Sequence, residues 1–460
     1  MEDRHFNTSR LRTSTGSDKR SNNQLFESDR GRVLFSAPFR RLQSKAQVFS
    51  LESNAAVRSR LTHTMEVAHV GRYISQQILD LAKENNEQSF SEQCKMIIPI
   101  VETACLLHDI GNPPFGHLGE NAIQEWFREN TMSIFHTSTS NKLSETNPYY
   151  LDLLNFDGNP QGARIILTLQ GYPGKKGLNL TSAQIGALIK YPRLSPDKSG
   201  KYKKIAVFTS EKESIQKVWD DLNIEWGNRH PLVYIMEAAD DIAYSLSDIE
   251  DGIEKGIITE KQVFDFLEEN FDNYSDDIKG CIPNIESPNG IVNRFVSFRT
   301  SMINLLTKRS ADFFYENRKN INNFKSIFDK EKGDDYSLAL NSINQFCLKH
   351  LYKSKEAEDI EIAGYNIVYG LLEKFSLLLK LNESDFRNLI EDGKGKALAR
   401  RMYSKIPKSL VGHYIEAVDN NPKDEWFIRS QMIVDYISGM TDDFALQIHK
   451  LLNGIEIKVI

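Results

Sequence analysis

Apolar residues recur at spacings of three and four along most of this chain, which is the period of one face of an α-helix. Two such stripes carry polar side chains at one end. The first begins on a histidine and comprises His63, Val67, Val70, Ile74, Ile78 and Leu81. The second ends on a His-Asp pair and comprises Ile97, Val101, Ala104, Cys105 and His108. Each stripe predicts a helix that buries one face.

Gly111 and the Pro113-Pro114 pair prevent the second helix from continuing. A new helix is predicted to start near His117, which would place His117 and Glu120 on one face, three residues apart. A further long helix is predicted over 231–253, and its apolar face comprises Ile235, Ala238, Ala239, Ile242, Leu246 and Ile249.

These patterns predict an all-α protein in three parts. Residues 1–25 are polar and rich in Ser, Thr and Arg, and we expect a flexible N-terminal arm. Residues 26–260 are predicted to form the helical core, with polar loops over 133–150 and 192–201. The segment VFTSEKE (207–213) predicts a short strand or turn before a helix. Residues 261–460 alternate amphipathic helices with charged loops and are expected to pack on the core.

Composition narrows the functional class. With 460 residues, 40% of them hydrophobic, the chain can build a substantial core. We expect no membrane association, because no apolar run reaches the ~18 residues of a membrane span and the N-terminus lacks the apolar segment of a signal peptide. The four cysteines are scattered without a CxxC pair, which argues against a zinc ribbon or a disulfide framework and fits a reducing cytoplasm.

The net charge of −6 argues against a globally basic nucleic-acid binder. Local basic patches exist in the N-terminal arm (Arg10, Arg12, Lys19 and Arg20) and over 198–204. Solvated surface is the simpler interpretation of such lysine-rich loops. Single-stranded DNA is the alternative ligand.

Histidine and aspartate at the ends of apolar stripes indicate a metal site, because buried polar groups need a partner and a divalent cation supplies one. Without a cation, His63 and His108-Asp109 would be hydrogen-bonded core residues. The next carboxylate is predicted within 237–252, where Asp240, Tyr244 and Asp248 lie four apart on one strip. A solvent-facing acidic stripe is the alternative there, and a surface ion pair is the alternative for His117 and Glu120.

Beyond these local patterns, most of the chain resembles the deoxyguanosine triphosphate triphosphohydrolase (dGTPase) family of the HD-domain metal phosphohydrolases. The order His63, His108-Asp109, Asp240 matches the H…HD…D pattern of that superfamily. The dGTPase resemblance is carried by seven blocks: ESDRGRVLFSAPFRRLQSKAQVF (27–49), NAAVRSRLTHTMEVAHVGRYI (54–74), HDIGNPPFGHLGE (108–120), FDGNPQGARIIL (156–167), KYP (190–192), PLVYIMEAADDIAYSLSD (231–248) and DYISGMTDDFAL (435–446).

This resemblance implies roles for individual residues. The implied metal ligands are His63, His108, Asp109 and Asp240, and the implied catalytic pair is His117 and Glu120. The implied deoxyribose contacts are Gln47, Tyr244 and Asp248, and the implied phosphate contacts are Arg60, Lys190, Tyr191 and Lys204. The implied cofactor is one Mn²⁺ or Mg²⁺ per subunit, although the ligand types alone would equally suit Zn²⁺, Fe²⁺ or Ni²⁺.

The implied reaction is attack of water on the α-phosphorus of dGTP, which releases deoxyguanosine and inorganic triphosphate. The family also implies a homo-oligomer, often a hexamer. Three alternatives remain open from the sequence: a broad-specificity dNTP triphosphohydrolase, a 5′-nucleotidase of the same superfamily, and a regulatory protein that binds single-stranded DNA on a retained HD scaffold.

Overall fold

The computed structural model describes residues 1–14, 19–52, 54–171, 177–197, 201–283, 293–329 and 333–455. Within these ranges the regular structure is helical, and the extended pairings are two isolated bridges, Arg10–Thr181 and Ala46–Ser59. The prediction of an all-α fold is confirmed.

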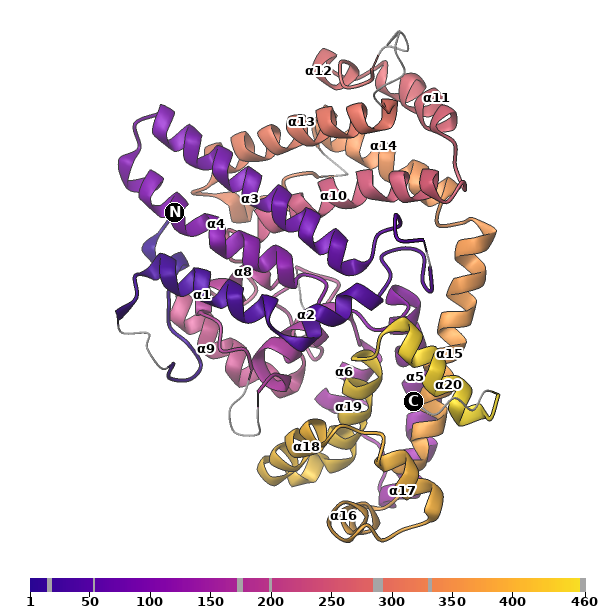
Figure 1. Cartoon of the computed structure of the whole chain (residues 1–460). Helices are drawn as coiled ribbons and strands as arrows, with labels where there is room; N and C mark the ends of the chain where they lie inside the picture. Colours follow the sequence, from indigo (N-terminus) through magenta and orange to yellow (C-terminus); the bar gives the residue numbers. More distant parts are fainter. Residues whose placement is uncertain are drawn as a thin grey trace.

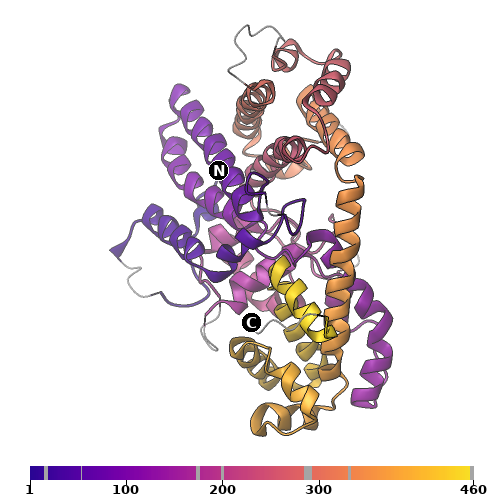
Figure 2. The ribbon, with the colours of Figure 1, turned by 45° about the vertical axis from the view of Figure 1, so that its right-hand side comes forward.

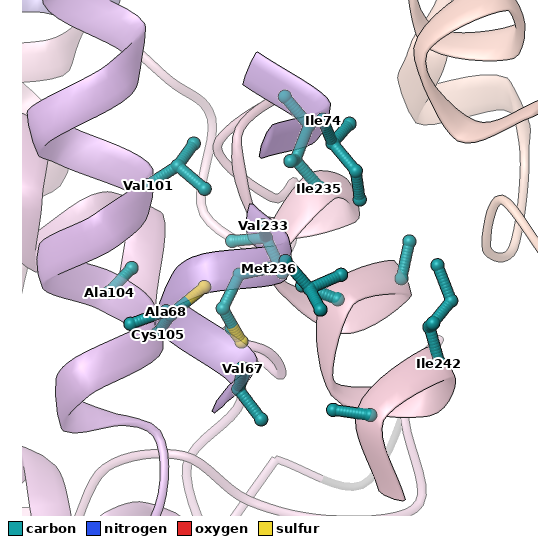
Figure 3. Packing of buried hydrophobic residues seen from close by; sticks show 14 of the residues in the cluster. Val67, Ala68, Ile74, Val101, Ala104, Cys105, Val233, Ile235, Met236 and Ile242 are labelled. Carbon is teal, nitrogen blue, oxygen red and sulfur yellow. The ribbon is translucent and has the colours of Figure 1, made fainter. Parts of the chain in front are cut away.

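Three long helices form the centre of the molecule: α3 (Arg60–Glu84), α4 (Gln88–Leu107) and α10 (Val233–Glu254). They are the helices predicted from the apolar stripes. α3 begins where the Ser59 side chain accepts a hydrogen bond from the Thr62 backbone N–H. Figure 3 shows the apolar faces of the three helices meeting. At Gly71 a Cβ atom would lie 2.7 Å from the Cys105 sulfur, so glycine permits the close approach of α3 and α4.

Two further groups of helices complete this first core (Figure 1). One group comprises α1 (Asn22–Leu34), α2 (Ala37–Arg41), α8 (Ser182–Leu188) and α9 (Lys212–Leu222). The other lies at the far end of α10 and comprises α11 (Glu260–Phe271), α12 (Asp276–Lys279), α13 (Arg294–Asn317) and α14 (Asp335–His350). Short turns are η1 (Asp3–Phe6), η3 (Leu42–Ser44), η4 (Ile165–Leu169), η5 (Thr209–Glu211), η6 (Ile321–Asn323) and η7 (Pro422–Asp424).

A second apolar core lies at the other end of the molecule and joins segments far apart in sequence. Its N-terminal contributors are α5 (Gly116–Thr139) and α6 (Pro148–Leu154), whereas Ala163 of the intervening α7 (Gly158–Arg164) belongs to the first core. Its C-terminal contributors are α15 (Lys355–Leu379), α16 (Glu383–Asp392), α17 (Ala397–Tyr403), α18 (Lys408–Asn420), α19 (Glu425–Ser438) and α20 (Asp442–Asn453). Figures 1 and 2 show α15 running beside α5 and linking the two cores. The cores therefore do not divide at residue 260: α11 to α14 extend the first core, whereas α15 to α20 form the second core together with α5 and α6.

Two local expectations are wrong. The described part of the predicted flexible arm is packed on the core: Phe6 is buried, and the Arg10 guanidinium lies 2.8 Å from the buried Asp29 carboxylate. Residues 15–18 lie outside the described residues. The predicted loop over 133–150 is helical as far as Thr139, because the face with Thr131, Ile134 and Ser138 is buried. The segment VFTSEKE forms η5 and leads into α9.

Among the described helices, α15 is the one that is long and apolar enough to cross a membrane by length and composition. Half of its most apolar stretch is buried inside the protein, between α5, α19 and α20. A core helix passes the same test, so this feature is weak evidence for a membrane span.

Candidate metal centre and active site

Four side chains from three helices converge at the centre of the first core. His63 lies on the first turn of α3, His108 caps α4, Asp109 follows it, and Asp240 comes from α10. Ligand atoms of His63, His108 and Asp109 all lie within 4.8 Å of one another. The Asp240 Oδ1 atom lies 3.4 Å from Nε2 of each histidine. The four residues predicted as metal ligands are therefore brought together.

The protonation of His108 shows that this cluster suits a cation. Its Nδ1 atom lies 2.7 Å from the Cys105 carbonyl oxygen, which can only accept, so Nδ1 carries the proton. In the neutral ring, Nε2 then presents a lone pair towards Asp240, and lone pairs facing a carboxylate repel each other. Nε2 of His108 and both ring nitrogens of His63 are buried without a hydrogen bond. Such orphaned nitrogen atoms fit metal ligation.

The carboxylates of the cluster are held in their charged form. Burial by itself would raise the pKa of Asp109, but without a metal the protonated form of His108, together with the Arg60 guanidinium, lowers it to about 2. The pKa of Asp240 likewise lies well below its usual value, because Lys190 and the histidines outweigh burial. Arg60 Nη1 lies 2.7 Å from Asp109 Oδ2, and Lys190 Nζ lies 3.0 Å from Asp240 Oδ2. Two anionic ligands beside two imidazoles match the preferences of a divalent transition metal.

The second constellation is a hydrogen-bonded chain from His117 through Glu120 to α7. The His117 Nδ1 atom lies 2.7 Å from Glu120 Oε2, and the Gly158 backbone N–H donates to Glu120 Oε1 at 2.6 Å. The hydrogen bond from His117 to the Glu120 carboxylate raises the pKa of His117. Glu120 is buried, whereas the His117 side chain is 73% exposed. A buried carboxylate thus orients an accessible imidazole, as general acid–base catalysis requires.

Asn112 connects the two constellations. Its side-chain amide donates to Asp109 Oδ1 at 2.7 Å. A Cβ atom at Gly158 would lie 2.0 Å from the Asn112 side-chain oxygen, so only glycine fits beneath it. Gly158 at the start of α7, whose N–H binds Glu120, is therefore packed directly against Asn112, whose side chain binds Asp109.

A cavity of about 490 Å³ opens beside both constellations. The predicted site residues that line it are Gln47, Arg60, Asp109, His117, Asp240 and Tyr244. Its volume lies in the range of about 300–1,000 Å³ that is usual for small-molecule sites. His63, His108 and Glu120 lie outside its lining and contact the lining residues.

Four predicted substrate contacts are not among the residues that line this cavity. Lys190 is bound to Asp240, and Lys204 pairs with the Asp157 carboxylate at 2.9 Å. Tyr191 packs near Tyr202, with ring centroids 5.9 Å apart. Asp248 is fully buried and accepts a hydrogen bond from the Tyr352 hydroxyl. Burial raises the pKa of Asp248 to about 7, although the Tyr352 hydrogen bond opposes this.

Sequence reasoning missed the contribution of the C-terminal region to this cavity. Tyr352, Ile360 and Glu361 line it, and the Tyr352 ring lies 6.2 Å from the Tyr244 ring. No motif or spacing relates Tyr352 to residues more than a hundred positions earlier. Asn112 and Gly158 could have been identified as site residues from the sequence, because they lie in the family-like blocks HDIGNPP and FDGNPQG, respectively.

Helices that bring two histidines and two aspartates together beside a His-Glu pair define a class, the HD-domain phosphohydrolases. The family model of the HD domain matches residues 60–154, and that of the phosphohydrolase-associated domain matches residues 396–451. The first match contains His63, His108, Asp109, His117 and Glu120, but not Asp240.

The chain is also similar along nearly its whole length to proteins named deoxyguanosinetriphosphate triphosphohydrolase. Relatives of that name from Salmonella paratyphi A, Salmonella schwarzengrund and Salmonella typhi are each 35% identical to it, over 94% of this chain and 94% of the relative. The chain therefore belongs to the deoxyguanosine triphosphate triphosphohydrolase family of the HD-domain superfamily.

Proposed function

We propose that this protein hydrolyses dGTP to deoxyguanosine and inorganic triphosphate in a metal-dependent reaction. The observation that supports the proposal most strongly is the ligand cluster of His63, His108, Asp109 and Asp240, which borders a nucleotide-sized cavity whose wall carries His117. Membership of the dGTPase family supports the choice of substrate.

The cluster would hold one divalent cation per subunit, Mn²⁺ or Mg²⁺ by resemblance to the family. When bound, such a cation polarises a phosphoryl oxygen and lowers the pKa of a bound water. Metal content measured on protein loaded with each ion, together with the rise in melting temperature that each produces, tests the ion independently of turnover.

His117 is the group proposed to transfer a proton. Because Nδ1 donates its hydrogen bond to Glu120, Nε2 is the nitrogen left to face the substrate. The raised pKa of His117 favours a protonated ring, which can donate from Nε2 to the 5′ oxygen of the departing deoxynucleoside. The Gly158 backbone N–H binds the other oxygen of Glu120 and fixes this carboxylate, so the His117 ring keeps one orientation.

The phosphate groups would be bound by Arg60, Lys190, Tyr191 and Lys204. Arg60 carries its positive charge into the cavity wall beside Asp109. Lys190 places an ammonium group beside the metal cluster through its ion pair with Asp240. Arginine and lysine are the usual phosphate-binding residues, because their N–H groups and charge complement the oxygens.

The sugar would lie against Tyr244, with Gln47 in the cavity wall near the 3′-hydroxyl. Asp248 is proposed for the same hydroxyl by family resemblance, and it would have to be reached past its hydrogen bond with Tyr352. Tyr244 packs between His63 and Tyr352, with ring centroids 6.3 Å and 6.2 Å away, so it has little freedom to move. A fixed aromatic ring against C2′ leaves no room for a 2′-hydroxyl, which gives a physical reason for selecting deoxynucleotides.

Glu361 of α15 is the proposed contact for the base. It lines the cavity, and a carboxylate accepts hydrogen bonds from the N1–H and 2-amino groups of guanine. Adenine, cytosine and thymine do not present this pair of donors. Glu361→Gln is therefore expected to lower the preference for dGTP over the other dNTPs.

Product analysis tests the proposal. Wild-type protein with Mn²⁺ is incubated with each dNTP and each deoxynucleoside monophosphate, and the products are separated by chromatography. Triphosphate release from dGTP supports the proposal, equal release from all dNTPs supports a broad-specificity enzyme, and phosphate from monophosphates supports a 5′-nucleotidase. His117→Ala should retain metal and lose about 10²–10⁴-fold in turnover; near-normal turnover would contradict the role of His117.

Regulation and assembly are also proposed from the family resemblance: a homo-oligomer such as a hexamer, a cytoplasmic location, and single-stranded DNA as a regulatory ligand. In the expected basic arm, Arg10 is buried against Asp29, and residues 198–200 lie outside the described residues. Arg12, Lys19 and Arg20 of that arm are exposed, and a second exposed basic segment covers α17 and its flanks, with Lys394, Lys396, Arg400, Arg401, Lys405 and Lys408. Light scattering tests the oligomer, and a salt-dependent gel shift tests DNA binding.

A further inference from the structure

A buried aspartate and a buried lysine, Asp442 and Lys45, tie the C-terminal region to the segments that contain the site residues. Asp442, at the start of α20, accepts a hydrogen bond from the Ala46 backbone N–H at 2.9 Å and another from the Phe115 backbone N–H at 3.0 Å. The Lys45 ammonium donates to the backbone carbonyls of Asn112 and Ser438, the latter at 2.9 Å. Asp442 and Lys45 are 3% and 4% exposed.

The two backbone segments that Asp442 binds lead directly into the cavity. Ala46 precedes Gln47, and Phe115 stands two residues before His117. Phe115 has a left-handed backbone, with φ 60° and ψ 20°. A bulky residue adopts that conformation only where its surroundings enforce it, and the hydrogen bond to Asp442 is one such constraint. The Asp442 carboxylate thus fixes both the Ala46-Gln47 segment, which contains the proposed sugar contact, and the Phe115 turn that starts α5.

Burial raises the pKa of Asp442, whereas its two backbone hydrogen bonds and the nearby Lys45 favour the charged carboxylate. Asp442 occupies the first turn of α20, where the helix dipole favours a negative charge, and Thr441 caps that helix. Both of its oxygens are used, one for each segment. An amide in its place keeps one acceptor and turns an NH₂ group towards a backbone N–H, so one of the two segments loses its anchor.

We infer that Asp442 is a positioning residue for the phosphohydrolase reaction, which holds Gln47 and His117 in register across the cavity. The inference rests on the proposed function. It makes the junction between α19 and α20 a part of the active-site machinery, although Asp442 itself is not among the residues that line the cavity. It also gives the phosphohydrolase-associated region, which is matched over 396–451, a physical task in the reaction.

The test compares Asp442→Asn with Asp443→Asn in the full-length, Mn²⁺-loaded protein. Asp443 is the exposed neighbour in the same helical turn, so its variant removes the same charge without touching the two backbone segments. Asp442→Asn should lose at least about tenfold in kcat, since small misplacements of catalytic groups reduce rates steeply, and its KM for dGTP should rise through Gln47. Metal content should match that of the wild type, and Asp443→Asn should retain wild-type kinetics.

A double-mutant cycle separates positioning from a general loss of structure. If Asp442 acts through His117, adding Asp442→Asn to His117→Ala should lower kcat by less than twofold further. A full multiplicative loss in the double variant, or a single Asp442→Asn variant with wild-type kcat, would overturn the inference. If Asp442→Asn does not fold, Asp442→Ser, which keeps one acceptor oxygen, enters the same cycle.

Wild-type protein assayed in parallel distinguishes failure of the proposed function from failure of the positioning role alone. A wild type that releases no triphosphate from any dNTP refutes the proposed function and, with it, this inference. Wild-type turnover together with an unaffected Asp442→Asn variant refutes the positioning role alone.

Discussion

Replacing Glu120 by glutamine should slow the reaction and move its pH dependence, while leaving the shape of the side chain intact. The Glu120 carboxylate accepts from His117 Nδ1 at 2.7 Å and from the Gly158 N–H at 2.6 Å, and it is buried. A glutamine side chain has one acceptor oxygen. It therefore either turns its NH₂ group towards the Gly158 N–H or forces His117 into the opposite tautomer.

The size of the effect follows from the hydrogen bond that is lost. Hydrogen bonds to charged groups contribute about 1.5–3 kcal/mol, and each 1.4 kcal/mol is about a factor of ten, so kcat should fall by about 10- to 100-fold. The hydrogen bond that His117 donates to Glu120 raises the pKa of His117, so its removal lowers that pKa. Because the protonated ring is the proposed acid, activity is lost as the pH rises through this pKa. The basic limb of the kcat profile should therefore move to lower pH in Glu120→Gln.

The assay is steady-state release of triphosphate from dGTP between pH 5 and 10, with metal content measured at each end. Glu125→Gln is the matched control, because Glu125 lies on the exposed side of the same helix and accepts a hydrogen bond from the Tyr365 hydroxyl. It should retain the wild-type rate and profile. A Glu120→Gln variant with a wild-type rate, or a slower variant whose basic limb has not moved, would refute the idea that Glu120 acts through His117.

Three further outcomes are expected. Asp435→Ala should destabilise the fold by about 1.5–3 kcal/mol in urea unfolding, because Arg164 loses the carboxylate that binds its Nε and Nη2 atoms at 2.8 and 2.7 Å and keeps its ion pair with Glu211. A loss below about 0.5 kcal/mol would contradict this. Gly158→Ala should reduce turnover at least about tenfold, because its Cβ atom collides with Asn112; unchanged kinetics would show that this packing can relax. Chelation of the metal should abolish turnover and lower the melting temperature, and Mn²⁺ should restore both; turnover that survives full chelation would exclude the metal mechanism.

Much of the fold could be predicted from the sequence, because the spacing of apolar residues marks the helices and Gly and Pro residues mark where they end. The stripes that begin at His63 and end at His108 follow the helical period, and Gly111 with Pro113-Pro114 breaks the pattern where α4 ends. The helices α3, α4 and α10 therefore lie where predicted. Periodicity failed over 133–139, because the Thr and Ser residues there read as loop while the tertiary structure buries one face.

The sequence by itself determined the chemical character of the site. His63 and His108-Asp109 at the ends of apolar stripes, with Asp240 on a third helix, indicate a compensating cation, and the order of the motifs resembles the family that uses one. Only the tertiary structure decided which distant residues complete the site. Tyr352, between α14 and α15, lines the cavity, and Asp442 at the start of α20 holds the Phe115 turn, because α15 packs along α5 and α20 packs on α15. A one-dimensional pattern records the face on which a residue lies in its own helix, but not which other helix will cover that face.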